Sequence, residues 1–243
     1  MVKHSQVKHQ QTNKVSLETD DKSSTFPMTY LRETLNTELI GKSGIEYYSE
    51  VPSTNDVAKL HGKTYGAQEG KLFIAEYQTA GRGQYGRKWD AAPGKSLLVS
   101  ITFTHRLKND EVHLPNLIGA LSIAQAIDIH TQLPAKIKHP NDVRINKKKV
   151  AGVLTEIQYD INKHPFFVLG FGVNVNISLD EFPDSLMKTA TSLLIESKVQ
   201  NGKLCRGELL YQILTNLENN YLHLKSGNMQ QINSELSKLE ELQ

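Results

Sequence analysis

The sequence predicts an α+β fold in which helices pack on a mixed β-sheet. Runs rich in β-branched and aromatic residues at 71–77, 96–103 and 166–177 indicate strands. Apolar residues spaced by three or four at 115–130, and again from 208 onward, indicate helices with one face on a core. The strands and helices do not alternate regularly, which favours α+β over a doubly wound sheet.

Length, charge and cysteine content limit the classes of protein to which this chain can belong. At 243 residues the chain can bury a full core, and it is long enough for one large domain with an appendage. A net charge of +2 gives no global field that would select nucleic acid or a membrane surface. The single cysteine, Cys205, excludes an internal disulfide framework and a multi-cysteine metal site, and it fits a reducing compartment.

The N-terminal residues are polar. Residues 1–28 have few large apolar side chains and lack the apolar core of a signal peptide, so we expect a disordered tail. No later stretch reaches the roughly 18 consecutive apolar residues of a membrane helix. We expect a soluble, cytoplasmic protein without a membrane partner.

The first ordered elements are short. Residues 30–36 fit a helix, and residues 45–48 fit a strand. A turn at 52–56 leads into a helix whose apolar face would be Val57 and Leu60.

Ser53 and Asp56 have the spacing of a helix-capping box. Capping alone would account for Ser53 and Thr54 as structural residues.

The strands at 71–77 and 96–103 enclose a glycine-rich loop, and a helix at 115–130 follows, closed by Pro134. Residues 137–143 then place a Pro-Asn-Asp turn just after a short strand, and local chemistry explains this turn by itself.

The lysines at 147–149 fit a solvated hairpin tip before the next strand. Gly170 and Gly172 interrupt the strand at 166–177, and paired glycines in a strand indicate a bulge or a close backbone approach to a ligand. Residues 208–224 and 229–242 predict two C-terminal helices.

The loop at residues 81–89 is the strongest functional signal. It holds three glycines, three cations and the only tryptophan of the chain. Glycine allows backbone to approach a ligand, and the cations can donate charge-assisted hydrogen bonds to carboxylate or phosphate, so an anion-binding loop is indicated. The loop also spells G-x-G-x-x-G, but it joins two strands, whereas a dinucleotide-binding loop opens a helix.

Other enzyme classes lack their motifs. Neither Gly-Lys-Ser sequence has the glycine that a P-loop requires, and no G-x-S-x-G elbow occurs. The nine histidines show no H-x-x-x-H or H-E-x-x-H spacing, which leaves zinc sites without support.

Four stretches in fixed order resemble the catalytic domain of biotin protein ligases, the biotin–[acetyl-CoA carboxylase] ligase family. They are Ser53-Thr54-Asn55, residues 76–89, residues 138–142 with 149–152, and residues 170–176. The resemblance covers residues 41–195. It implies a biotin/lipoate ligase-like fold similar to class II synthetases, with a catalytic domain at 29–197 and a helical segment at 198–243.

The resemblance implies a two-step reaction. The biotin carboxylate attacks the α-phosphorus of Mg-ATP and gives biotinyl-5′-AMP and pyrophosphate. A lysine of a biotin carboxyl carrier protein or domain then attacks the mixed anhydride. Such chemistry needs alignment of two anions and neutralisation of their repulsion more than covalent work by side chains.

The resemblance also implies roles by motif position. The catalytic residues would be Lys149, Arg82 and Arg87. The biotin-binding set would be Ser53, Thr54, Asn55, Gln78, Gly81, Arg82, Gly83, Lys149, Gly152 and Gly170. The ATP and adenylate set would be Gln84, Arg87, Trp89, Asn141, Asp142, Lys149 and Asn174, with Asp142 linked to Mg²⁺ through ATP.

Two departures from the family pattern stand out. The fourth loop position is Gln84 where better-known members carry arginine, so a leakier adenylate or compensation by a cation such as Lys88 is expected. His139 replaces a common tryptophan. We expect no N-terminal winged helix, and hence no DNA partner. We also expect no C-terminal SH3-like barrel. The resemblance allows a homodimer.

Two alternatives remain open. A lipoate or octanoyl protein ligase would share the fold and the transfer of an acyl group to lysine, although the chain has no R-R-x-x-G-G-G-type stretch. A catalytically silent biotin- or nucleotide-sensing module is the second.

Overall fold

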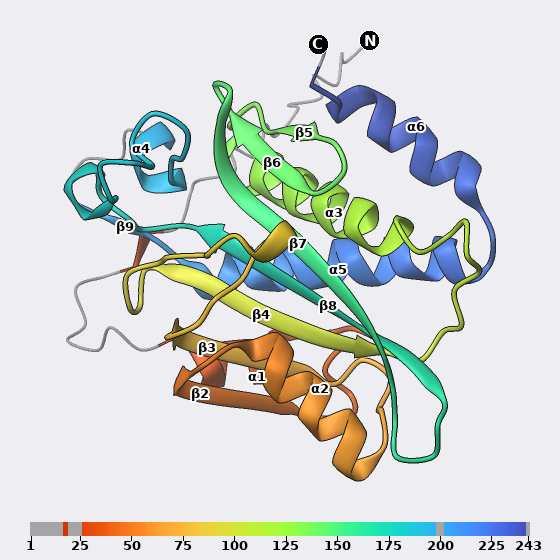
Figure 1. Ribbon diagram of the computed structural model, residues 1–243. Helices are drawn as coiled ribbons and strands as arrows, with labels where there is room; N and C mark the ends of the chain where they lie inside the picture. The colour runs from red at the N-terminus through yellow and green to blue at the C-terminus, as the bar shows by residue number, and fades with distance from the viewer. Residues whose placement is uncertain (1–16, 19–25, 198–201, 242–243) are drawn as a thin grey trace, which may run out of the picture.

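The chain forms a mixed seven-stranded sheet with helices on both faces in a computed structural model that describes residues 17–18, 26–197 and 202–241 (Figure 1). This arrangement confirms the predicted α+β class. The predicted disordered tail lies outside these residues, apart from positions 17–18 and 26–28.

The helices are α1 (Met28–Thr34), α2 (Thr54–Tyr65), α3 (Leu114–Thr131), α4 (Leu193–Ser197), α5 (Arg206–Lys225) and α6 (Met229–Leu239). The strands of the large sheet are β2 (Ile45–Val51), β3 (Leu72–Gln78), β4 (Ser96–Phe103), β5 (Lys136–Lys138), β6 (Asp142–Ile145), β7 (Lys148–Tyr159) and β8 (Pro165–Asn174). Short 3-10 turns, η1 (Gln84–Gly86) and η2 (Leu179–Glu181), and a small pair of strands, β1 (Leu17–Glu18) with β9 (Lys203–Leu204), complete the elements.

The sheet runs in the order β2-β3-β4-β8-β7-β6-β5. Only the β2–β3 pair is parallel. Strand β4 is an interior strand, third in this order, and is buried along all eight residues, which agrees with its mostly apolar sequence.

The two faces of the sheet carry different layers. Helices α3 and α5 lie side by side on one face, and α3 is apolar nearly all round because it packs against the sheet, α5 and α6 (Figure 1). Helix α2 and the glycine-rich loop cover the other face (Figure 1). The main hydrophobic core therefore lies on the α3–α5 side, and the opposite side carries a smaller apolar cluster under α2 beside its polar and glycine residues.

Two expectations about α2 are wrong. Ser53 is the N-cap residue but its side chain makes no capping hydrogen bond, and Leu60 is 66% exposed, whereas Val57 packs against the core as predicted. The buried side of the helix is instead Thr54, Asn55, Ala58 and Gly62. Small residues are required there because a Cβ on Gly62 would lie 2.5 Å from the Phe166 ring, and the polar residues face the cavity described below.

The remaining predicted elements agree with the structure. Asn146 and Lys147 form the tip between β6 and β7, with positive φ of 49° and 66°, as a two-residue hairpin turn of type I′ requires. The lysine run therefore begins at a hairpin tip, as predicted, but Lys149 already lies within β7.

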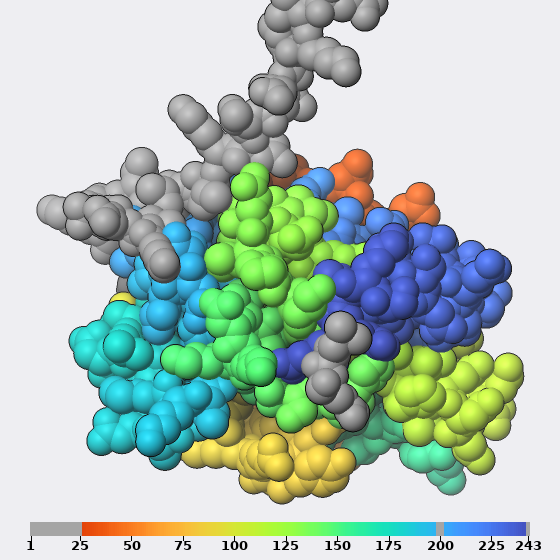
Figure 2. Space-filling view, turned by 90° about the horizontal axis from the view of Figure 1, so that it is seen from above, coloured from red at the N-terminus to blue at the C-terminus, as the bar shows by residue number. Residues whose placement is uncertain are grey.

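The C-terminal helices attach to the sheet at two places. Arg206, at the start of α5, forms a buried ion pair with Glu76 of β3 at 2.7 Å. At the other end, Glu241 donates its backbone N–H to Ile137 of β5 at 2.9 Å. Figure 2 shows α6, in dark blue, packed beside the green segment that contains β5 and β6.

None of the helices in the described part of the chain combines the length and apolarity needed to cross a bilayer.

Candidate active site

Two adjoining cavities lie on the face of the sheet that α2 shares with the glycine-rich loop. The inner cavity, enclosed by α2, β3, β7, β8 and the loop, is narrow, with about 40 Å³ of free space. The outer cavity, between the loop, the β5–β6 turn and residues 182–190, measures about 520 Å³. Gly83, Trp89, Asn141 and Lys149 line both.

The two predicted residue sets separate between these cavities. Of the set predicted for biotin, the residues that line the inner cavity are Ser53, Thr54, Asn55, Gln78, Arg82, Gly83, Lys149, Gly152 and Gly170. Gly81 does not line it; this glycine is buried where a Cβ would lie 2.6 Å from the Trp89 carbonyl. The whole set predicted for the nucleotide lines the outer cavity: Gln84, Arg87, Trp89, Asn141, Asp142, Lys149 and Asn174.

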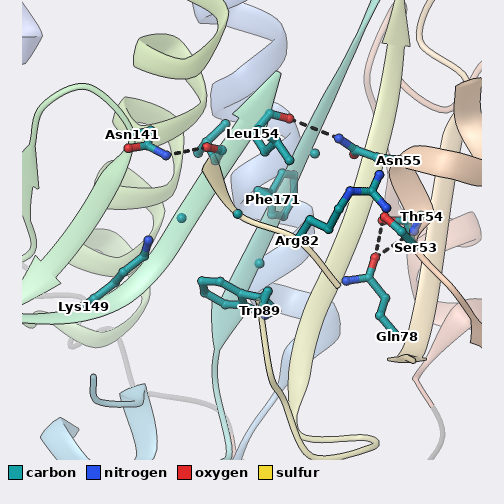
Figure 3. Close-up of a pocket in the computed structure, with 15 residues that line it drawn as sticks. Ser53, Thr54, Asn55, Gln78, Arg82, Trp89, Asn141, Lys149, Leu154 and Phe171 are labelled. Atoms are coloured by element: carbon teal, nitrogen blue, oxygen red, sulfur yellow. Dashed lines mark hydrogen bonds between the residues drawn. The ribbon is translucent and has the colours of Figure 1, made fainter. Parts of the chain in front are cut away.

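Hydrogen bonds organise the floor of the inner cavity. The Thr54 backbone N–H donates to Gln78 Oε1 at 2.7 Å (Figure 3), and the Asn55 carboxamide donates to Glu156 Oε2 at 2.8 Å. Ser100, in the middle of β4, lies 2.7 Å from the Thr54 hydroxyl and 2.6 Å from Asn55 Oδ1. Sequence reasoning missed Ser100; its only signal was a serine between the apolar residues Val99 and Ile101 of β4.

The Asn55 side chain explains why residue 170 is glycine. A Cβ on Gly170 would lie 1.9 Å from Asn55 Oδ1, so any other residue would displace the carboxamide. The close approach predicted for this glycine is therefore made by a protein side chain in the structure. A ligand contact at Gly170 stays a prediction.

Arg82 is held by an acidic residue that sequence reasoning assigned to capping. Its guanidinium donates two hydrogen bonds to the Asp56 carboxylate, both at 2.6 Å, in a bidentate pair. The pair holds the pKa of Asp56 at about 2, against the effect of burial. Glu156 lies 3.8 Å from the same guanidinium and pairs with Lys59 at 2.6 Å, which completes a charged border on the inner cavity.

Lys149 lies where the two cavities meet. Its Nζ is 2.5 Å from Asp142 Oδ1 and 5.6 Å from the centre of the Trp89 ring. The backbone at this position is fixed by residues 189–191, since Lys149 N–H donates to Thr189 and its carbonyl accepts from Thr191. The ammonium therefore projects from a rigid strand between both spaces.

Trp89 packs its indole against the two glycine-bearing strands. A Cβ on Gly172 would lie 2.5 Å from the indole, and one on Gly152 would lie 3.3 Å from it (Figure 3). Glycine at these positions thus makes room for the aromatic ring. The indole N–H is buried and has no hydrogen-bond partner within the described residues.

The outer cavity combines fixed side chains with exposed ones. Asn141 and Asn174 are fixed, since their side-chain amides donate to the carbonyls of Val153 and Thr191 at 2.8 and 3.0 Å. Arg87 is exposed on the loop, and no hydrogen bond or ion pair holds its guanidinium within the described part of the chain. Other cations of the wall are Lys88, Lys138 and Arg144, so this cavity is electropositive.

His139, the departure from the family pattern at the β5–β6 turn, contacts the C-terminal segment. Its Nε2 lies 2.8 Å from Glu240 Oε1, just after α6. The C-terminal segment therefore borders the turn that carries Asn141 and Asp142.

As for a metal, no group of three or more His, Cys, Asp and Glu residues could hold an ion among the described residues. The outer cavity offers Asp142 and Asp90, and Asp142 is already paired with Lys149. Such a donor set suits an ion that keeps most of its ligands from water and substrate phosphates, as Mg²⁺ does.

Comparison with known proteins places this geometry in context. The model of the biotin/lipoate A/B protein ligase family matches residues 47–174. The bifunctional ligase/repressor BirA of Bacillus subtilis is 33% identical over 191 residues, covering 79% of this chain and 57% of that protein. The biotin–[acetyl-CoA-carboxylase] ligase of Mycobacterium tuberculosis is 31% identical over 174 residues, covering 66% of this chain and 60% of that protein. The chain thus spans somewhat over half the length of these relatives.

Solved structures agree with the fold. The biotin protein ligase from Aquifex aeolicus in complex with biotin and ATP superposes with a TM-score of 0.69 at 29% identity, covering 80% of this chain and 78% of that one. The biotin protein ligase from Leishmania major in complex with biotinyl-5-AMP gives a TM-score of 0.65 at 25% identity, covering 81% of each chain.

Proposed function

The chain belongs to the biotin/lipoate A/B protein ligase family, and on that premise we propose that it is an ATP-dependent biotin protein ligase. In the first step the biotin carboxylate attacks the α-phosphorus of ATP, which forms biotinyl-5′-AMP and releases pyrophosphate. In the second, the amine of an acceptor lysine attacks the acyl carbon, and AMP leaves. The printed names of the similar ligases support this choice of substrates.

One observation carries the proposal: the Lys149 ammonium lies at the junction of a polar inner cavity and an electropositive outer cavity. Biotin would occupy the inner cavity and ATP the outer one, so that carboxylate and α-phosphate meet beside Lys149. Two anions approach each other in this step, and a fixed cation between them stabilises the charge that develops.

The other residues would bind and orient. Arg87, exposed on the loop, would contact phosphate, and Trp89 would offer a flat face to adenine. Mg²⁺, when bound with ATP, would neutralise phosphate charge, and Asp142, whose carboxylate lines the outer cavity, would hold it. Burial of the inner cavity would keep water from the labile anhydride.

The polar inner cavity also argues against the lipoate alternative. Thr54, Asn55 and Gln78 offer hydrogen-bonding groups, which suit the ureido ring of biotin. A dithiolane ring has no N–H or C=O with which to pair, and buried polar groups left without partners are costly.

The test is biotin-dependent exchange of radioactive pyrophosphate into ATP by the purified full chain, with lipoate and octanoate as competing acids. Transfer is then followed by mass spectrometry of a biotin carboxyl carrier domain and of its acceptor Lys→Arg variant. Exchange with biotin, and transfer to the wild-type acceptor alone, are expected. Exchange with lipoate only would favour a lipoate protein ligase. Absence of exchange with every acid would favour a catalytically silent sensing module.

Three further expectations remain predictions: a cytoplasmic location, the absence of a DNA partner and the possibility of a homodimer. The division at residues 28 and 197 is likewise a prediction.

A further inference from the structure

Ser100 is a fully buried hydroxyl beneath the inner cavity, and the proposed reaction has not used it. It lies at the centre of β4, where its neighbours in sequence are Val99 and Ile101. Its oxygen is within hydrogen-bond distance of both Thr54 and Asn55. Because a hydroxyl has one hydrogen, the direction of each bond can be worked out.

The orientation of Asn55 is settled first. Its nitrogen faces two groups that only accept: Glu156 Oε2 at 2.8 Å, and the Leu154 carbonyl at 3.3 Å, the bond drawn in Figure 3. Its oxygen therefore faces Ser100, and the Ser100 hydroxyl must donate its hydrogen to Asn55. The Ser100 oxygen can then only accept from Thr54.

The orientation of Gln78 is settled by the backbone. Its oxygen accepts the Thr54 backbone N–H at 2.7 Å, so its amide nitrogen points away from Thr54 toward the cavity (Figure 3). The Thr54 hydroxyl has one hydrogen and two acceptors in reach, Ser100 at 2.7 Å and the already bonded Gln78 oxygen at 3.0 Å. Donation to Ser100 is the shorter bond and leaves lone pairs of Thr54 Oγ1 for a ligand.

We propose that Ser100 is a positioning residue that makes Thr54 an acceptor beside the donor amide of Gln78, so that the inner cavity selects a ring edge carrying adjacent N–H and C=O groups. A cyclic urea has this edge: its N–H donates to Thr54 Oγ1 and its C=O accepts from Gln78 Nε2. The inference deepens the proposed function and rests on it, because biotin carries such a ring.

The test compares two serines of one strand. Ser100→Ala removes the acceptor for Thr54 and the donor for Asn55, whereas Ser96→Ala removes a buried hydroxyl of β4 that has no hydrogen-bond partner within the described residues. Ser100→Ala should raise KM for biotin about tenfold, the size of one net hydrogen bond, with kcat and KM for ATP changed less than about twofold. Ser96→Ala should leave all three near wild type.

A double-mutant cycle checks that Ser100 acts through Thr54. Thr54→Val keeps the shape of the side chain but deletes the hydroxyl, and it leaves the Ser100–Asn55 bond in place. Thr54→Val should raise KM for biotin to a similar degree, and adding Ser100→Ala should then cost about twofold or less instead of a second factor of ten. Thermal melting of each variant identifies loss of fold, and Thr54→Val alone still tests the acceptor if Ser100→Ala does not fold.

The outcomes separate the two proposals. If wild-type protein neither binds nor turns over biotin, the proposed function fails and this inference with it. If wild-type protein uses biotin but Ser100→Ala behaves as Ser96→Ala does, or raises KM for ATP as much as KM for biotin, or combines additively with Thr54→Val, Ser100 has no positioning role.

Discussion

The inner and outer cavities share the Lys149 ammonium but differ in how their side chains are held. Around the inner cavity, buried carboxamides and hydroxyls hydrogen-bond to one another and to fixed backbone groups. Around the outer cavity, cations stand on an exposed loop and a turn. The two arginines of the loop show the contrast, since Arg82 is fixed by Asp56 whereas Arg87 is exposed.

The difference reflects the ligands that each cavity would take. A small neutral ring offers only a few hydrogen bonds, so its recognition requires donors and acceptors that are already in place. A triphosphate brings several charges and a metal ion, and mobile cations can close around it after it arrives. We expect substitutions at the inner cavity to change biotin affinity, and those at the outer cavity to change nucleotide retention.

Lys149→Ala tests the residue that belongs to both cavities and should have the largest effect. Removal of the cation should lower biotin-dependent pyrophosphate exchange by about 10²–10³-fold, as for loss of other groups that stabilise developing charge. The fold should be retained, as judged by circular dichroism. Lys148→Ala, which alters the neighbouring lysine outside both cavities, is the control. Near-normal exchange by Lys149→Ala would refute its assignment.

Gly172→Ala tests whether the indole links the two cavities. The added Cβ would lie 2.5 Å from the Trp89 ring and force it to move, at a cost of about 1–3 kcal/mol. Binding of ATP and of biotin should weaken together by about tenfold or more in isothermal titration. Weakening of biotin alone would mean that the indole serves the inner cavity only.

Asp56→Asn breaks the bidentate pair between Arg82 and Asp56 beside the inner cavity. It should raise KM for biotin about fivefold and leave KM for ATP unchanged, because Arg82 loses its anchor beside the inner cavity. Both side chains are more than a third exposed, so the stability change should stay below about 1 kcal/mol. Equal changes in both KM values would contradict a role confined to the inner cavity.

The same carboxylate gives a dependence on pH. Asp56 has a folded pKa of about 2, below its ordinary 3.8, so the pair stabilises the fold above about pH 4 and this contribution is lost as the pH falls toward 2. Thermal melting of the wild type and of Asp56→Asn should therefore converge in acid and differ by a constant amount between pH 6 and 8. A difference that changes between pH 6 and 8 would identify another titrating group.

Gln84→Arg should have the smallest effect. It tests whether exposed cations around the outer cavity retain the adenylate by electrostatic attraction. An added cation on the loop should slow dissociation of biotinyl-AMP about fivefold, the upper range for an exposed ion pair. The rate can be measured by trapping released adenylate after rapid dilution. An unchanged rate would mean that a neighbouring cation such as Lys88 already compensates for Gln84.

Three features could be predicted because each depends on local pattern or on motif order. They are the order of elements, the loop between two strands, and the grouping of Lys149 with the glycine-rich strands. Ser100 and Asp56 could not, since their roles depend on partners 46 and 26 residues away along the chain. The prediction for α2 is wrong at Leu60, because the rule that apolar residues lie inside fails where a helix turns polar residues toward a cavity. No periodicity reveals that Gly172 makes room for Trp89.

The packing of Trp89 against Gly172 has a practical consequence. Because this is the sole tryptophan of the chain, its fluorescence comes from one ring at the junction of the two cavities. Quenching or a spectral shift on adding each ligand can be assigned to that position without labels. The protein thus carries its own optical reporter, suited to stopped-flow recording of the order in which substrates arrive.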